Sequence, residues 1–183
     1  MASQLPAVPR AIFTLIEPIS LLAGCFGALI DPEWFIKQQI PASTTIASKL
    51  GSIAASPAES DSARLVALQL GNTYGLVFLI GVGVLYSTSE IKVVRAYLTA
   101  CLIADVTHVG LTCWGLGYDR TMDFASWSAT TWGNIAFTIF LGLTRTAYFL
   151  GLFGPNGSSS TRTPLALVSS SRKSVAGSTK KTA

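Results

Sequence analysis

Asp105 and His108 have the clearest capacity for chemistry in this sequence. They lie three positions apart in the apolar stretch ACLIADVTHVG, residues 100–110, and His108 is the only histidine of the chain. Residues at this spacing share one face of a helix, and a carboxyl group beside an imidazole can exchange a proton in a dry cavity. The pair is either part of such a site or a polar contact that satisfies itself within one helix. We favour the site.

The apolar surroundings of this pair are typical of the whole chain. Of its 183 residues, 50% are hydrophobic and only 12% are charged, whereas soluble domains carry about 25% charged residues. A helix that crosses a membrane needs roughly 20 mostly apolar residues. The windows that meet this requirement are residues 11–30, 63–86, 93–116 and 128–153.

These windows are best explained as transmembrane helices. Most of them are apolar on all sides, which argues against a water-soluble bundle, and none sustains the alternation of a β-strand. The first window could also be a signal peptide, but Glu17 and Pro18 interrupt its apolar core and no convincing cleavage site follows. The sequence therefore predicts an all-α, polytopic membrane protein with a bundle of four transmembrane helices.

The polar residues of the four windows fall at two depths. Alternating helix directions place Glu17 and Arg145 near the membrane surface that carries the termini, where we expect a structural ion pair. Residues closer to the opposite surface are expected to line one cavity: Gln69, Asn72, Asp105, His108, Trp132 and Asn134. A charge at the bilayer centre costs about 2.5–3.5 kcal/mol, so such residues normally face the protein interior. For Gln69 and Asn72, a hydrogen bond to a neighbouring helix is an equally good explanation.

The segments outside the windows indicate topology. Pro32-Glu33-Trp34-Phe35 suggests a turn into a short interfacial helix, and residues 41–62 are expected to form a loop. Basic residues near the helix ends, together with the basic tail, place both termini in the cytosol. Residues 1–154 are then the transmembrane domain, and residues 155–183, rich in Ser, Thr, Gly, Lys and Arg, are expected to be a disordered cytosolic tail.

The end of the tail resembles a sorting signal. Its last residues, Lys180-Lys181-Thr182-Ala183, resemble the dilysine signal that retains membrane proteins in the endoplasmic reticulum. This resemblance implies the COPI coat as a partner. A basic tail that contacts anionic lipid headgroups is an equally good interpretation.

Several stretches of the chain together resemble a known family. They are residues 13–20 (FTLIEPIS), 68–74 (LQLGNTY), 104–108 (ADVTH) and 131–134 (TWGN). In combination they resemble a fungal family of four-helix membrane proteins of unknown function, over roughly residues 5–154. More distantly, the layout is similar to the EXPERA group of sterol isomerases and sterol-binding receptors, and to fungal membrane-bound meroterpenoid cyclases. The resemblance implies a cavity for a hydrophobic ligand, lined by acidic residues, a histidine and a Trp/Asn pair.

An isomerase or cyclase of this kind protonates an alkene or epoxide and later removes a proton elsewhere. Asp105 would be the acid in a low-dielectric site, His108 would take or relay the proton, and Trp132 would offer a cation–π surface to a carbocation. The residues expected to orient a ligand hydroxyl are Asn134, Asn72 and Gln69. The alternative is a non-catalytic binder of a sterol or other lipid, or an accessory subunit; a transporter is less favoured.

Other classes of protein are disfavoured by what the sequence lacks. It has no Walker loop, no GxGxxG motif and no nucleophile elbow. Cys25, Cys101 and Cys113 fall inside the windows, where reduced cysteines act as small hydrophobes, and no residues have the spacing of metal ligands. We therefore expect membrane lipid and a hydrophobic small molecule as partners, with no nucleic acid, no metal and no separate cofactor.

Overall fold

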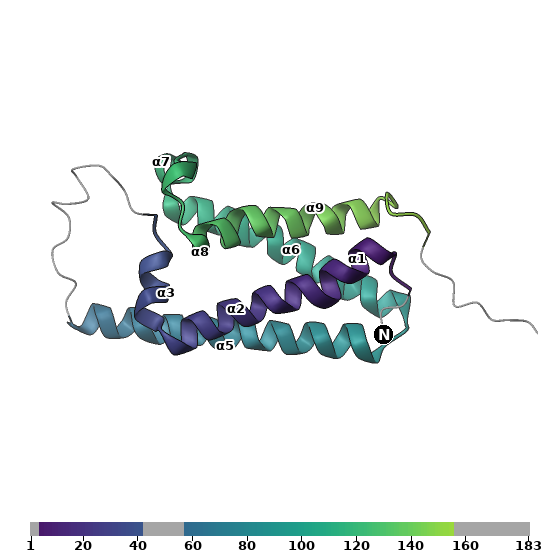
Figure 1. Cartoon of the computed structure of the whole chain (residues 1–183), viewed down its shortest axis with the longest axis horizontal. Coiled ribbons are helices and arrows are strands. Elements are labelled where there is room, and N and C mark those ends of the chain that lie inside the picture. The colour runs from purple at the N-terminus through teal and green to yellow at the C-terminus, as the bar shows by residue number, and fades with distance from the viewer. Residues whose placement is uncertain (1–3, 42–56, 156–183) are drawn as a thin grey trace, which may run out of the picture.

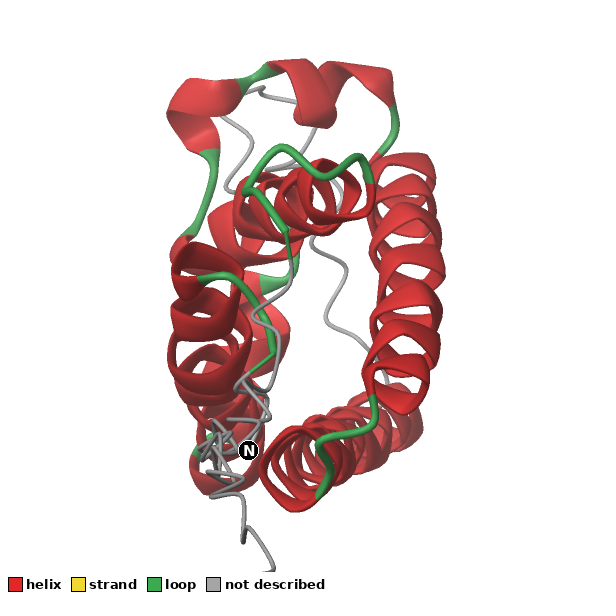
Figure 2. Cartoon of the chain, turned by 90° about the vertical axis from the view of Figure 1, so that its right-hand side faces the viewer, coloured by secondary structure: helices red, strands yellow, loops and turns green. Residues whose placement is uncertain are grey.

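The computed structural model describes residues 4–41 and 57–155, with the side chains of the second range described from residue 60. Throughout these residues the regular elements are helices, as Figure 2 shows in red. This confirms the all-α prediction. The terminal tail with Lys180 and Lys181 and most of the connection between the first two windows lie outside the described residues.

The first long helix is continuous but changes its pitch near the N-terminus. Pro18 has no N–H and cannot bond to the carbonyl of Thr14 four residues earlier. The Tyr86 hydroxyl, on another helix, donates to this carbonyl at 2.8 Å instead. Rescue of a freed backbone group by a neighbouring helix is how membrane proteins tolerate an internal proline. The segments of this helix are α1 (Ala7–Ala11), the π-helical turn η1 (Ile12–Ile16) and α2 (Glu17–Ile30).

The remaining elements are two long helices, a segmented rod and short connecting helices. Gly117, which follows the second long helix, adopts φ +77°, a left-handed conformation that glycine adopts without strain. The elements are α3 (Pro32–Gln38), α5 (Pro57–Ser87), α6 (Ile91–Leu116), α7 (Tyr118–Met122), the 3₁₀ turn η2 (Phe124–Ser126), α8 (Ala129–Trp132), the π-helical turn η3 (Gly133–Phe137) and α9 (Thr138–Phe149). The last three follow one another without a break.

Three helices of the described chain are long and apolar enough to cross a membrane: Ala7–Ile30, Ser60–Ser87 and Ile91–Leu116. They correspond to the first three predicted windows and support a membrane protein. The fourth window is helical as well, from Ala129 to Phe149, but it is not among these three. Its apolar residues are diluted by polar ones, including Asn134 and Arg145.

The connection after the first window differs in part from the expectation. The predicted short helix at Pro32 is confirmed, and the Asp31 side chain caps its start by accepting from the Trp34 N–H at 2.9 Å. The predicted loop over residues 41–62 is wrong at its end, because α5 begins at Pro57. Proline suits the first position of a helix, and the acidic residues that follow are stabilised near a helix N-terminus.

The helices associate in two pairs, α2 with α5 and α6 with α9. In Figure 1, α2 lies above α5 in the lower half, α9 lies along the top, and α6 runs obliquely from behind α9 at the upper left toward the lower right. Small residues let α2 and α5 approach closely. A Cβ added at Gly71 would lie 2.9 Å from the Ala28 Cβ, and one added at Gly75 would lie 3.3 Å from the Cys25 sulfur. Glycines four residues apart are a common contact surface between membrane helices.

Two separate buried clusters lie at opposite ends of the bundle: the two pairs meet in the first, and the second joins α2 and α5 to α3. At the end that holds α1, Phe13 packs with Leu85, Leu98 and Tyr148. At the end that holds α3, the buried residues are Ala28, Phe35 and Ala67. Each cluster lies beside one group of polar residues, and these two groups make up the candidate site.

Candidate functional site: an ion cluster and a cavity

The centre of the first polar group is Arg145 on α9, which is fully buried. One guanidinium nitrogen, Nη2, donates to Oε1 of Glu17 on α2, and the other, Nη1, donates to Oδ2 of Asp105 on α6. The guanidinium also lies over the Phe13 ring, 5.0 Å from its centroid, in a cation–π contact. We call Glu17, Asp105 and Arg145 the ion cluster. It ties α2 to the α6–α9 pair.

Two features of the local backbone position the side chains of the ion cluster. Gly142 lies one turn before Arg145, and a Cβ there would be 3.5 Å from the Asp105 Cβ, so α6 and α9 approach closely beside the carboxylate. Glu17 directly follows the π-helical turn η1. Such turns are frequent at functional positions of helices.

The pairing within the ion cluster is incomplete. Glu17 is 6% exposed, and its second carboxylate oxygen, Oε2, has no hydrogen-bond partner among the described residues. The same holds for Nε of Arg145 and the hydroxyl of Tyr148. Buried polar atoms are nearly always paired. The cluster therefore keeps free capacity to bind a proton or a small polar group.

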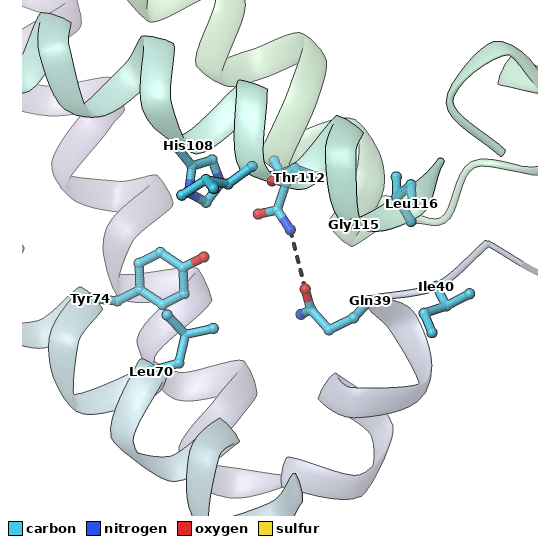
Figure 3. A pocket seen from close by; sticks show the side chains of 10 residues that line it. Gln39, Ile40, Leu70, Tyr74, His108, Thr112, Gly115 and Leu116 are labelled. Carbon is cyan, nitrogen blue, oxygen red and sulfur yellow. Dashed lines mark hydrogen bonds between the residues drawn. The ribbon is translucent and has the colours of Figure 1, made fainter. Parts of the chain in front are cut away.

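The second polar group lies along a cavity of about 360 Å³ between α5, α6, η3 and the end of α3. Figure 3 shows Tyr74 of α5 and His108 of α6 directed into this space. The lining residues are Gln39, Ile40, Leu70, Tyr74, His108, Leu111, Thr112, Gly115, Leu116 and Asn134. Apolar walls with a few convergent polar groups are typical of small-molecule sites.

Two contacts hold the end of α3 over this cavity. The Asn134 side-chain amide donates to Oε1 of Gln39 at 3.2 Å, drawn as a dashed line in Figure 3. The Ser128 hydroxyl lies 2.6 Å from the carbonyl of Gln38, to which it donates, and also accepts from the Thr131 N–H as the cap of α8. We call the contact of Gln39 with Asn134 the amide bridge.

The structure divides the expected catalytic pair between the two groups. Asp105 bonds to Arg145 and is absent from the cavity lining, whereas His108 lines the cavity. Glu17 and Arg145, expected as an ion pair, are in contact. Asp105 can join this ion pair because the guanidinium group of arginine has two terminal nitrogens in a fork, and each can bind a carboxylate.

The expected ligand-binding residues are also divided. Asn134 lines the cavity, but Gln69 and Asn72 are exposed on the outside of α5. They lie two and one positions from Gly71, which faces α2, so they point about 200° and 100° away from it around the helix. Trp132 is 49% exposed and packs edge-on against Trp127, with 5.0 Å between ring centroids.

Gln39 and Tyr74 are among the lining residues that were not expected from the sequence. Tyr74 follows Asn72 by two positions in a stretch already singled out, and its ring packs 3.2 Å from the Cβ position of Gly24. A signal for it was the GNTYG spacing, which places the tyrosine beside two contact glycines. Gln39 carried no signal, because it lies in an irregular connection.

The cavity lining has side chains that can bind a ligand and exchange protons. His108 and Tyr74 are the titratable residues of the cavity lining, and both can donate and accept hydrogen bonds. Within the described ranges no three His, Cys, Asp or Glu side chains come together to hold a metal ion.

Comparison with known proteins gives a family without an assigned activity. No curated protein and no solved structure matches the chain. The family described as a domain of unknown function (DUF7704) matches residues 2–155, which include every described helix. The chain therefore belongs to this family.

Proposed function

We propose that this protein binds a hydrophobic small molecule of sterol- or terpenoid-like character in the cavity between α5 and α6. The observation that carries the proposal is the cavity itself, about 360 Å³ in volume and walled largely by Leu70, Leu111 and Leu116. This volume lies within the range of roughly 300–1,000 Å³ that small-molecule sites occupy. An apolar ligand would fill the space between the leucines.

The polar residues of the cavity select the ligand's functional group. The His108 ring, the Tyr74 hydroxyl and the Asn134 amide line one space and come from α6, α5 and η3. Each of them can bond to a hydroxyl or a carbonyl oxygen. We infer that the preferred ligand has an apolar body and one oxygen-bearing group.

Catalysis is the second candidate, favoured by the presence of His108 and Tyr74 in the same cavity. An isomerase or cyclase needs a proton donor and an acceptor at the reacting carbons. Asp105 would not be the donor, because Arg145 holds it outside the lining. In a catalytic version of the proposal, His108 and Tyr74 would exchange protons with the ligand.

We further propose four transmembrane helices in the membrane of the endoplasmic reticulum, with both termini on its cytosolic side. The continuous rod from Ala129 to Phe149 is about 30 Å long at 1.5 Å per residue, which equals the thickness of the hydrocarbon core. Arg145 is buried in it, so this charge is not presented to lipid. The basic residues and the dilysine-like end of the tail support the orientation and the compartment.

The binding proposal is tested with a photoreactive sterol alcohol and the full chain purified in maltoside micelles. Leu70→Trp fills the cavity, whereas Gln69→Trp places the same side chain on the exposed face of the same helix. We expect labelling of the wild type and of Gln69→Trp, competed by unlabelled sterol, and its loss in Leu70→Trp. Equal labelling of the two variants would show that the probe binds elsewhere.

Turnover separates the catalytic version from simple binding. The unlabelled sterol is recovered after incubation and analysed for isomers by mass spectrometry and chromatography. If the protein is an enzyme, His108→Gln abolishes the conversion while the probe still labels the protein. Labelling without any conversion by the wild type would favour the binder.

A further inference from the structure

The ion cluster holds more acid than its one arginine can balance. Arg145 carries one positive charge, whereas Glu17 and Asp105 together carry two negative charges when ionised. All three side chains are at most 13% exposed. An uncompensated charge costs several kcal/mol in a protein interior, and a helix in the hydrocarbon core offers no water to offset that cost.

Among the described residues, Arg145 is the cation in salt-bridge contact with the two carboxylates. His108, three residues after Asp105 on α6, interacts with Asp105 electrostatically but forms no salt bridge with it. From the same helix, Tyr97 and Cys101 lie near enough to interact electrostatically with Glu17 and Arg145. Phe13 on η1 covers the Arg145 guanidinium, and Gly81 on α5 lies beside Tyr97, with its Cβ position 2.6 Å from the Tyr97 hydroxyl.

The geometry identifies which carboxylate oxygen of the ion cluster lacks a hydrogen-bond partner. Arg145 donates to Oε1 of Glu17, and Oε2 is buried without a partner among the described residues. This pattern suits a carboxylic acid, in which one oxygen is a carbonyl that accepts and the other carries the proton. Asp105 is the more exposed of the two acids and has His108 as a second, nearby group, so it is the better place for the negative charge.

We propose that Glu17 is a proton-binding site: its Oε2 holds one exchangeable proton at neutral pH, while Asp105 is ionised and paired with Arg145. The proton comes from water or buffer, forms the O–H bond of a neutral carboxyl group, and returns to water or buffer when it leaves. With the proton bound, the cluster has no net charge. Without it, one negative charge remains between α2 and the α6–α9 pair.

Infrared spectroscopy of the full chain in maltoside micelles tests this proposal, because a protonated carboxyl group has a C=O stretch that an ionised one lacks. At neutral pH we expect one such band in the wild type, shifted by exchange into D₂O. Glu90→Gln, in an exposed position outside the cluster, retains the band. Glu17→Gln, which keeps the shape of the neutral acid, removes it. Asp105→Asn also removes it, because Arg145 then balances an ionised Glu17.

Isotope labelling makes the assignment independent of any variant. Glutamate labelled with ¹³C at the side-chain carboxyl shifts the wild-type band, whereas aspartate labelled in the same way leaves it unchanged. The proposal is overturned if the wild type has no protonated-carboxyl band at neutral pH, or if the band follows the aspartate label or persists in Glu17→Gln. Because these readouts need no ligand, they stand or fall separately from the cavity proposal.

Discussion

Polar contacts join the first half of the chain to the second half at both ends of the bundle, but by opposite means. At the end with α1, a fully buried guanidinium binds two carboxylates. At the end with α3, the amide bridge joins two neutral side chains that are only partly buried, 3.2 Å apart. Breaking a buried ion pair is far more damaging than breaking one neutral hydrogen bond near the surface. We therefore expect the charged end to resist separation more strongly than the amide end, which lies beside the cavity.

The strongest test of this contrast is Arg145→Gln. Two carboxyl groups would remain buried without their cation, and we expect the free energy of unfolding to fall by about 3–5 kcal/mol. Thermal and denaturant unfolding in maltoside micelles, followed by circular dichroism, measures the loss. Arg64→Gln, an exposed position on α5, should change stability by less than about 0.5 kcal/mol. Similar values for the two variants would mean that the ion cluster does not hold the pairs together.

Tyr86→Phe tests the next largest contact at the charged end. It removes the hydroxyl that bonds to the Thr14 carbonyl, and Pro18 cannot replace that bond. An acceptor left unsatisfied costs about 1–3 kcal/mol, and the same unfolding measurement should detect it. Tyr118→Phe is the control, since Tyr118 is 77% exposed. If Tyr86→Phe is as stable as its control, the freed carbonyl is satisfied in some other way.

The smallest effect on stability is expected for Asn134→Ala, which removes the amide bridge. Gln39 is left partly exposed, so the free energy of unfolding should fall by no more than about 1 kcal/mol. The main effect of this variant should be on access to the cavity: we expect the photoreactive sterol to label it faster than the wild type. A loss of stability as large as that of Arg145→Gln would reverse the contrast between the two ends.

Much of the fold follows from the sequence, because long apolar runs have few alternatives to membrane helices. The contact between Glu17 and Arg145 also follows from the sequence, because both residues are expected at a similar depth in the membrane. The position of Asp105 was harder to infer, because helix periodicity relates it to His108 on the same helix, while its contact is made across to α9. At 1.5 Å per residue, Asp105 and Arg145 lie about one turn apart in depth, a gap that a long arginine side chain can cross.

The cavity was the least predictable part. Its end wall is Gln39, in a connection without periodicity, and its position depends on tertiary contacts from Ser128 and Asn134. The facing of Gln69 and Asn72 depends on which side of α5 packs against α2. A helix that is apolar all round gives no clue to that side, except through the spacing of Gly71 and Gly75.

The two π-helical turns bear on how this sequence can change in length. A π-helical turn contains one residue more than the α-helical turn it replaces, so deleting a residue within η1 would leave an unbroken helix. The wider turn already accommodates the extra residue, so the α-helical segments on either side would keep the faces they now present. Glu17 and Arg145 lie outside the two turns and would therefore stay in position. A deletion in the regular α-helical part between η3 and Arg145, by contrast, would rotate one side of the helix by about 100° and turn Arg145 away from its carboxylates. Single-residue deletions should therefore be tolerated better within the two π-helical turns than elsewhere in these helices.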